Sequence, residues 1–191
     1  MNFLAHLYLA GDDPELLVGG LMGDFVKGRL TAGRFPEGIN LGIALHRHID
    51  SAAGRSNDFL ASKHRLDVRF GLYRGVLVDL FYDHFLAKEW EKFHPAPLAT
   101  FIAQCHSQLL DRVEILPPRL AGFLPAIFTE LLPSYQEPVG IERALQRMAA
   151  RLSRPSPLAE GGGELVRHYQ ALQADFHRFL PAMTAEVGRF L

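Results

Sequence analysis

The chain has 191 residues, of which 48% are hydrophobic and 21% charged, with a net charge of −1; this composition is typical of one soluble domain with a substantial core. Cys105 is the only cysteine, which excludes an internal disulfide and favours a reducing compartment, and no apolar run approaches the ~18 residues of a membrane span. The opening MNFLAHLYLAGDD has no basic leader, so we expect no signal peptide and a cytoplasmic protein.

Apolar residues recur at helical spacing along the whole chain, and no segment alternates convincingly with period two. We therefore predict an all-α fold in a single domain spanning residues 1–191, with Asp13 capping the second helix and Pro14 in its first position. The expected helices, in chain order, cover residues 3–10, 15–27, 37–53, 58–64, 70–93, 97–116, 122–132, 141–152 and 164–190.

Two of these segments have a composition that predicts their place in the fold. Residues 70–93 are apolar on nearly all sides, so we expect this helix to lie centrally. Residues 153–163 (SRPSPLAEGGG) are rich in proline and glycine, which predicts a loop before the last helix.

The helix expected over 70–93 carries two acids on an apolar face. Asp79 and Asp83 are four residues apart and share that face with Val76 and Leu86. Buried carboxylates are usually paired or bound to a metal, so this spacing favours a metal site between facing helices. The alternative is a pair of capping or salt-bridged acids at a helix crossing.

A second inward stripe lies in the helix expected over 37–53. His46 and Asp50 are four residues apart on the face of Ile39 and Ile43. Imidazole suits manganese, iron or zinc, and a carboxylate suits manganese or magnesium. The alternative is a histidine that is merely hydrogen-bonded within the core.

Three further residues are weaker candidates. Asp24 is expected on the inward face of the second helix, where it is either a ligand or an acid that binds the backbone of a final turn. His84 follows Asp83 about 100° around its helix. His6 lies in the middle of an apolar helix, where a core role is the alternative to a catalytic one.

Basic residues are concentrated in one part of the chain. Residues 25–74 contain nine lysines and arginines against four acids, a balance that suits an anionic substrate or an acidic partner. A solvated surface that happens to be rich in arginine is the alternative interpretation.

Four segments, taken in order, resemble the acyl carrier protein phosphodiesterase family, also called acyl carrier protein hydrolyase. They are MNFLAHLYLA at the start, GDFVKG at 23–28, LHRHID at 45–50 and VDLFYDHFLAKEW at 78–90. The resemblance covers nearly the whole chain. It implies removal of the 4′-phosphopantetheine arm from holo-acyl carrier protein, and a relationship to the HD phosphohydrolases, which are helical metalloenzymes that typically use manganese.

The order of the ligand residues departs from the usual HD pattern of a histidine, an adjacent His-Asp pair and a later aspartate. Here the adjacent pair is reversed as Asp83-His84, and Asp24 precedes the other acids. A permuted HD-like bundle would explain this order. It places the metal site in these motifs without deciding which side chains bind the ion.

The resemblance and the inward stripes together define the expected site. A divalent metal is expected, manganese first and magnesium or iron as alternatives, with a ligand pool of Asp24, His46, Asp50, Asp79 and Asp83. His84 or His6 is expected to protonate the departing serine oxygen. Lys27 and Arg47 are expected to hold the phosphate or to contact the acidic carrier protein.

Two other functions stay open at this stage. One is an HD-like phosphohydrolase of a small nucleotide, which would need no protein surface. The other is a non-catalytic helical binding protein whose inward acids form only salt bridges, and which would carry no stoichiometric metal. We expect holo-acyl carrier protein as the partner, and neither nucleic acid nor a membrane.

Overall fold

The computed structural model describes residues 1–31 and 33–191, and their regular structure is entirely helical, as predicted. The α-helices are α1 Phe3–Ala10, α2 Pro14–Met22, α3 Glu37–Arg55, α4 Asn57–Arg65, α5 Tyr73–Lys88, α6 Leu98–Leu110, α7 Pro118–Ala121, α8 Leu132–Ser134, α9 Pro138–Ala150, α10 Gly162–Arg167 and α11 Tyr169–Phe190. Four 3-10 turns (Val68–Phe70, Trp90–Lys92, Val113–Ile115 and Pro157–Glu160) and a π-helix over Ala126–Leu131 complete the chain. No helix in the described part combines the length and apolarity needed to cross a bilayer.

Several predicted helices end at other residues in the structure. The second helix stops at Met22, because the chain turns over residues 23–25, and this turn takes Asp24 off the helix face on which we expected it. The segment 70–93 divides into α5 and a 3-10 turn, and the last segment is interrupted at His168. Much of the predicted helix 122–132 is a π-helix.

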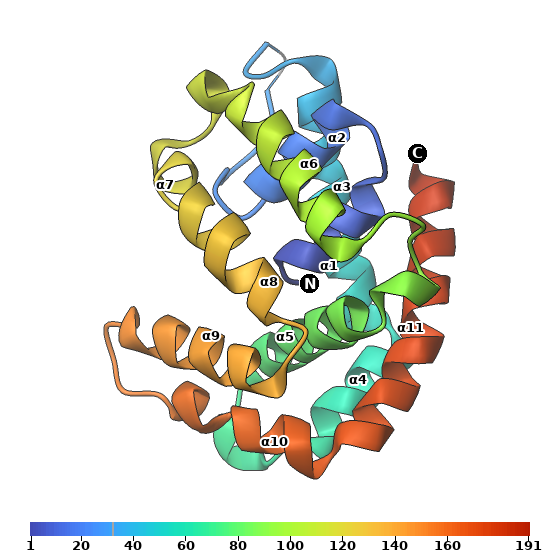
Figure 1. The fold of residues 1–191 in the computed structure, drawn as a ribbon, viewed down its shortest axis with the longest axis vertical. Helices are drawn as coiled ribbons and strands as arrows, with labels where there is room; N and C mark the ends of the chain where they lie inside the picture. The colour runs from blue at the N-terminus through green and yellow to red at the C-terminus, as the bar shows by residue number, and fades with distance from the viewer. Residues whose placement is uncertain (32) are drawn as a thin grey trace.

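Helix α5 is the centre of the fold, as its composition predicts. It is buried along Leu77–Ala87 with the single exception of Asp79, which is half-buried. Helices α1, α4, α9 and α11 contact it. Figure 1 shows α11 running down one side of the molecule past α4, and the N-terminus lying near the middle, between α1 and α5. The first three residues are partly buried, and the amino group of Met1 is fully covered.

The most extensive helix contact joins α2 to α3, and two glycines make it so close. A Cβ atom on Gly19 would lie 2.3 Å from the carbonyl oxygen of Ile39, and one on Gly42 would lie 2.6 Å from the carbonyl oxygen of Leu16. Because neither residue has a side chain, the two backbones touch. This contact brings the end of α2, with Asp24, against the middle of α3, with His46.

Candidate metal centre

Three side chains from two helices converge beside the start of α5. His6 of α1 and His46 and Asp50 of α3 place their ligand atoms within 4.8 Å of one another. The two imidazole rings stack with centroids 3.7 Å apart and an interplanar angle of 15°. The carboxylate of Asp50 lies 3.2 Å from Nε2 of His6 and 3.3 Å from Nε2 of His46. Both imidazoles are buried.

The backbone of α2 fixes the orientation of His46. Its Nδ1 donates a hydrogen bond of 2.7 Å to the carbonyl oxygen of Gly20, so Nε2 is the nitrogen left to face the acids. That Nε2 lies 3.5 Å from Oδ1 of Asp24. The α-carbon of Gly23 packs against the ring so tightly that a Cβ there would lie 2.2 Å from Cγ of His46.

The two stacked histidines have opposite proton affinities. Burial opposes a charge on His46, but its close contacts with Asp24 and Asp50 prevail and raise its pKa to about 9. Burial lowers the pKa of His6 to about 4, only partly offset by Asp50. Burial also opposes the charge on Asp50, yet contacts with both histidines hold its pKa well below the usual range. These pKa shifts favour a charged His46 next to ionised acids and a neutral His6.

Asp79 joins the cluster through the amino group of Met1. This amino group lies 2.7 Å from Oδ1 of Asp50 and 3.1 Å from Oδ1 of Asp79. Burial opposes its charge, but the two acids raise its pKa to about 10, whereas burial raises the pKa of the Asp79 carboxyl. The two carboxylates therefore hold a cation between them in this structure.

Asp83, expected as a metal ligand, has a different environment from Asp79. It is completely buried, and its carboxylate oxygens accept hydrogen bonds from the backbone N–H groups of Leu4 (2.8 Å) and Ala5 (2.9 Å). These are two of the first amides of α1, which have no partner inside their own helix. Asp83 thus caps α1 across the fold, which was the alternative left open by the sequence.

His84 is likewise placed apart from the cluster. Its Nδ1 lies 2.8 Å from the carbonyl oxygen of Tyr135, and its Nε2 lies 3.0 Å from the hydroxyl of Tyr169. Both ring nitrogens are therefore engaged, and burial lowers the pKa of this histidine. The ring faces Tyr135 and Tyr169 rather than the cluster, and its expected role as a proton donor stays a prediction.

Asp24 stands where three recesses meet. A recess of about 420 Å³ is lined by Asp24, Asp50 and Asp79 and reaches Leu72. A second, of about 280 Å³, joins Asp24 and the cluster to Lys27 and Arg47. A third, of about 180 Å³, leads from Asp24 between α1 and α9. With 57% of its side chain exposed, Asp24 is the acid most open to a ligand.

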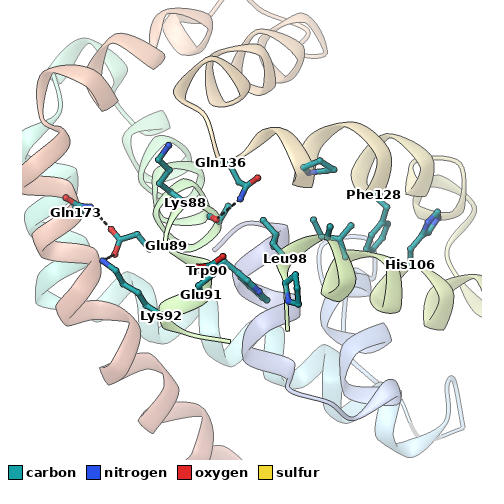
Figure 2. Close-up of a pocket in the computed structure, with 16 residues that line it drawn as sticks. Lys88, Glu89, Trp90, Glu91, Lys92, Leu98, His106, Phe128, Gln136 and Gln173 are labelled. Carbon is teal, nitrogen blue, oxygen red and sulfur yellow. Dashed lines mark hydrogen bonds and ion pairs between the residues drawn. The ribbon is translucent and has the colours of Figure 1, made fainter. Parts of the chain in front are cut away.

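A larger cavity lies elsewhere. It measures about 890 Å³ and opens between the end of α5, α6 and α8, and none of the predicted site residues lines it. Figure 2 shows its polar end, where Gln173 and Lys92 point toward Glu89, and its apolar end with Leu98 and Phe128. Both carboxylate oxygens of Glu89 have partners, so Glu89 is not free to bind a metal.

The donors present in the cluster fit a divalent metal. Both ring nitrogens of His6 are buried without a hydrogen-bond partner, because its contact with Asp50 is not aligned as a hydrogen bond. Such orphaned polar atoms are uncommon in folded proteins and need a partner. Two imidazole nitrogens with neighbouring carboxylates form a donor set suited to manganese or iron. Of the contacts within this cluster, the sequence predicted only the one between His46 and Asp50. No local pattern in the sequence pairs His6 with His46.

Comparison with known proteins gives a consistent family. Residues 1–183 match the family model described as acyl carrier protein phosphodiesterase. A protein of that name from Enterobacter sp. (strain 638) is 33% identical over 188 residues, covering 97% of both chains. Another from Klebsiella pneumoniae (strain 342) is 34% identical over 185 residues, covering 96% of this chain and 95% of the relative. No solved structure was found to match.

Proposed function

Because the chain belongs to the acyl carrier protein phosphodiesterase family, we propose that it hydrolyses the phosphodiester between 4′-phosphopantetheine and the serine of holo-acyl carrier protein. Water adds to phosphorus, the bond from phosphorus to the serine oxygen breaks, and that oxygen takes up a proton. The products are apo-acyl carrier protein and free 4′-phosphopantetheine. The match along almost the whole chain is the observation that carries this proposal.

We further propose that the reaction depends on a divalent metal, manganese in the first place, held in an HD-like arrangement. His6, His46 and Asp50 would hold the ion, with Asp24 at the open side and Asp79 behind. A bound metal of this kind supplies an activated water and neutralises phosphoryl charge. The unpartnered nitrogens of His6 and the outward-facing Nε2 of His46 support this assignment.

Two cations beside the cluster suit the substrate phosphate. Lys27 and Arg47 line the same recess as Asp24 and His46. One guanidinium nitrogen of Arg47 donates a 2.8 Å hydrogen bond to the carbonyl oxygen of Val26, which anchors the side chain at the wall of the recess. We propose that its remaining N–H groups and the ammonium of Lys27 hold the phosphate oxygens.

The decisive experiment incubates the full-length protein and Mn²⁺ with holo-acyl carrier protein and weighs the products by mass spectrometry. We expect the carrier protein to lose its arm and free 4′-phosphopantetheine to appear, with no reaction in excess chelator. A preparation that leaves holo-carrier protein intact but hydrolyses a nucleotide would instead support the small-nucleotide alternative. A preparation without metal or activity would support the binding-protein alternative.

Neighbouring histidines provide a matched pair of variants for the metal. His46→Gln should lose metal and turnover together, with a loss of ~10–100-fold in metal affinity, as is common at metal sites. His48→Gln is the control, because His48 lies two residues away and faces Glu186 (3.0 Å) and Phe190 instead. Equal metal content in the two variants would remove His46 from the site.

A further inference from the structure

The smallest of the three recesses that meet at Asp24 has the character of an organic binding pocket. It is largely apolar, with walls made by Phe3 of α1, Phe123, Leu131 and, from α9, Met148. Asp24, Asn2 and Met148 line both this cavity and the larger acidic recess. One ligand could therefore occupy this cavity and reach the metal-binding cluster at the same time.

Two arginines stand at the rim of this apolar cavity. The guanidinium of Arg151 lies 4.5 Å from the ring centroid of Phe123, stacked on it as a cation–π pair. Among the described residues, no ion pair involves Arg151. Arg147 lies beside it and pairs with Glu130 at 2.6 Å. The rim thus presents N–H donors to the oxygens of a ligand whose apolar part lies inside.

We propose that this cavity holds the pantoyl end of the 4′-phosphopantetheine arm, an inference that rests on the proposed function. The carbon chain next to the phosphate carries two methyl groups, followed by a hydroxyl and an amide. The apolar wall matches the methyl groups, and Arg151 matches the oxygens beyond them.

The volume agrees with this part of the arm rather than with all of it. Since one water occupies ~30 Å³ of liquid, about 180 Å³ has room for roughly six groups of that size. The pantoyl unit has six carbons, and its hydroxyl and carbonyl oxygens would lie at the arginine rim. The remainder of the arm, and any acyl group on its thiol, would lie outside the cavity.

The geometry also separates the two sides of the phosphodiester. With the arm in the apolar cavity, the serine side is left to the acidic recess, whose mouth carries Leu72, 97% exposed. Both recesses open onto Asp24, so one phosphate at the cluster can send one substituent into each.

The test measures how tightly the protein binds 4′-phosphopantetheine, by calorimetry on the full-length protein with Mn²⁺, beside the KM for holo-carrier protein. Ala144→Leu adds bulk to the cavity wall from α9, where Ala144 is buried. We expect binding of the arm to weaken roughly 10–200-fold, the usual effect of a misfitted methylene-sized group in an apolar pocket. Ala150→Leu, on the exposed face of the same helix, should bind as the wild type does.

The outcomes are separable. Wild-type protein that releases no arm would refute the proposed function itself. Release by the wild type together with unchanged binding in a folded Ala144→Leu would refute the cavity alone. If Ala144→Leu does not fold, Arg151→Gln decides, since its side chain is on the surface: weakened binding of the arm supports the proposal, and wild-type binding overturns it.

Discussion

Replacing Asp83 with alanine tests whether this acid is a helix cap or a metal ligand. The carboxylate accepts two amide N–H groups at the start of α1 in a fully buried setting. In Asp83→Ala both amides lose their acceptor, and their burial keeps them from bonding to solvent instead. We therefore expect the free energy of unfolding to fall, even when no metal is present.

The size of this loss follows from the two amides. Each buried, unsatisfied donor costs about 1–3 kcal/mol. Deleting the acid also relieves the burial that raises the pKa of Asp83 to about 7, which offsets part of the loss. We expect a net loss of about 2–4 kcal/mol, or roughly 4–16 °C in Tm for a chain of this size. Asp83→Asn keeps an acceptor for one amide but turns an NH₂ group toward the other N–H, so it should also be less stable than wild type.

The assay is thermal unfolding of wild type and both variants in excess chelator. If Asp83 served only to bind metal, its removal would leave the metal-free protein as stable as wild type, or more stable. A melting temperature for Asp83→Ala equal to or above that of wild type in chelator would therefore refute the capping role. The metal content of the folded variants is measured as well, by mass spectrometry at low temperature. This second measurement is needed because α1, the helix that Asp83 caps, also carries His6.

Three further predictions concern other parts of the molecule. Gly23→Ala should displace the ring of His46, which a Cβ would meet at 2.2 Å, and lower metal affinity ~10–100-fold, measured by metal titration. Although burial opposes its ionisation, buried Asp175 accepts hydrogen bonds from Ser62 and Arg65, which lower its pKa. Its contribution to stability is therefore present above the pKa of the unfolded state and is lost as pH falls through the pKa of the folded state. The loss of unfolding free energy in Asp175→Asn, measured by urea unfolding, should shrink toward low pH. Arg74 has no acidic partner among the described residues and follows exposed Leu72 by two residues. Arg74→Glu should raise the KM for carrier protein, and the wild-type KM should rise with salt. A KM that responds neither to the substitution nor to salt would mean that this surface is only solvated.

The existence of most helices could be predicted because it depends on local pattern. Asp13 followed by Pro14 does start α2, with the Asp13 carboxylate accepting from Glu15 and Leu16. Helix ends were harder to predict from the sequence, because tertiary contacts help to decide them. The second helix, for example, ends at Met22 with a turn over residues 23–25, for which we recognised no local signal. The π-helix over Ala126–Leu131 had no signal that periodicity could detect.

The candidate site could be predicted in part, as far as it depends on spacing within one helix. The spacing of His46 and Asp50 places both on one face of one helix, so their proximity follows from the sequence alone. The stacking of His6 on His46 joins residues forty positions apart and depends on how α1 crosses α3. No periodicity argument on a single helix contains that information.

An inward acid on an apolar helix face therefore has two explanations that sequence spacing cannot separate. Asp79 and Asp83 have the same helix, the same face and the same chemistry, yet one faces a cation and the other faces amides. What distinguishes them is the neighbour across the interface, here the N-terminal turn of α1. That turn needs an acceptor for its first amides and carries His6 one residue beyond them. The capping acid thus serves the candidate metal site by holding in place the helix that supplies one of its ligands.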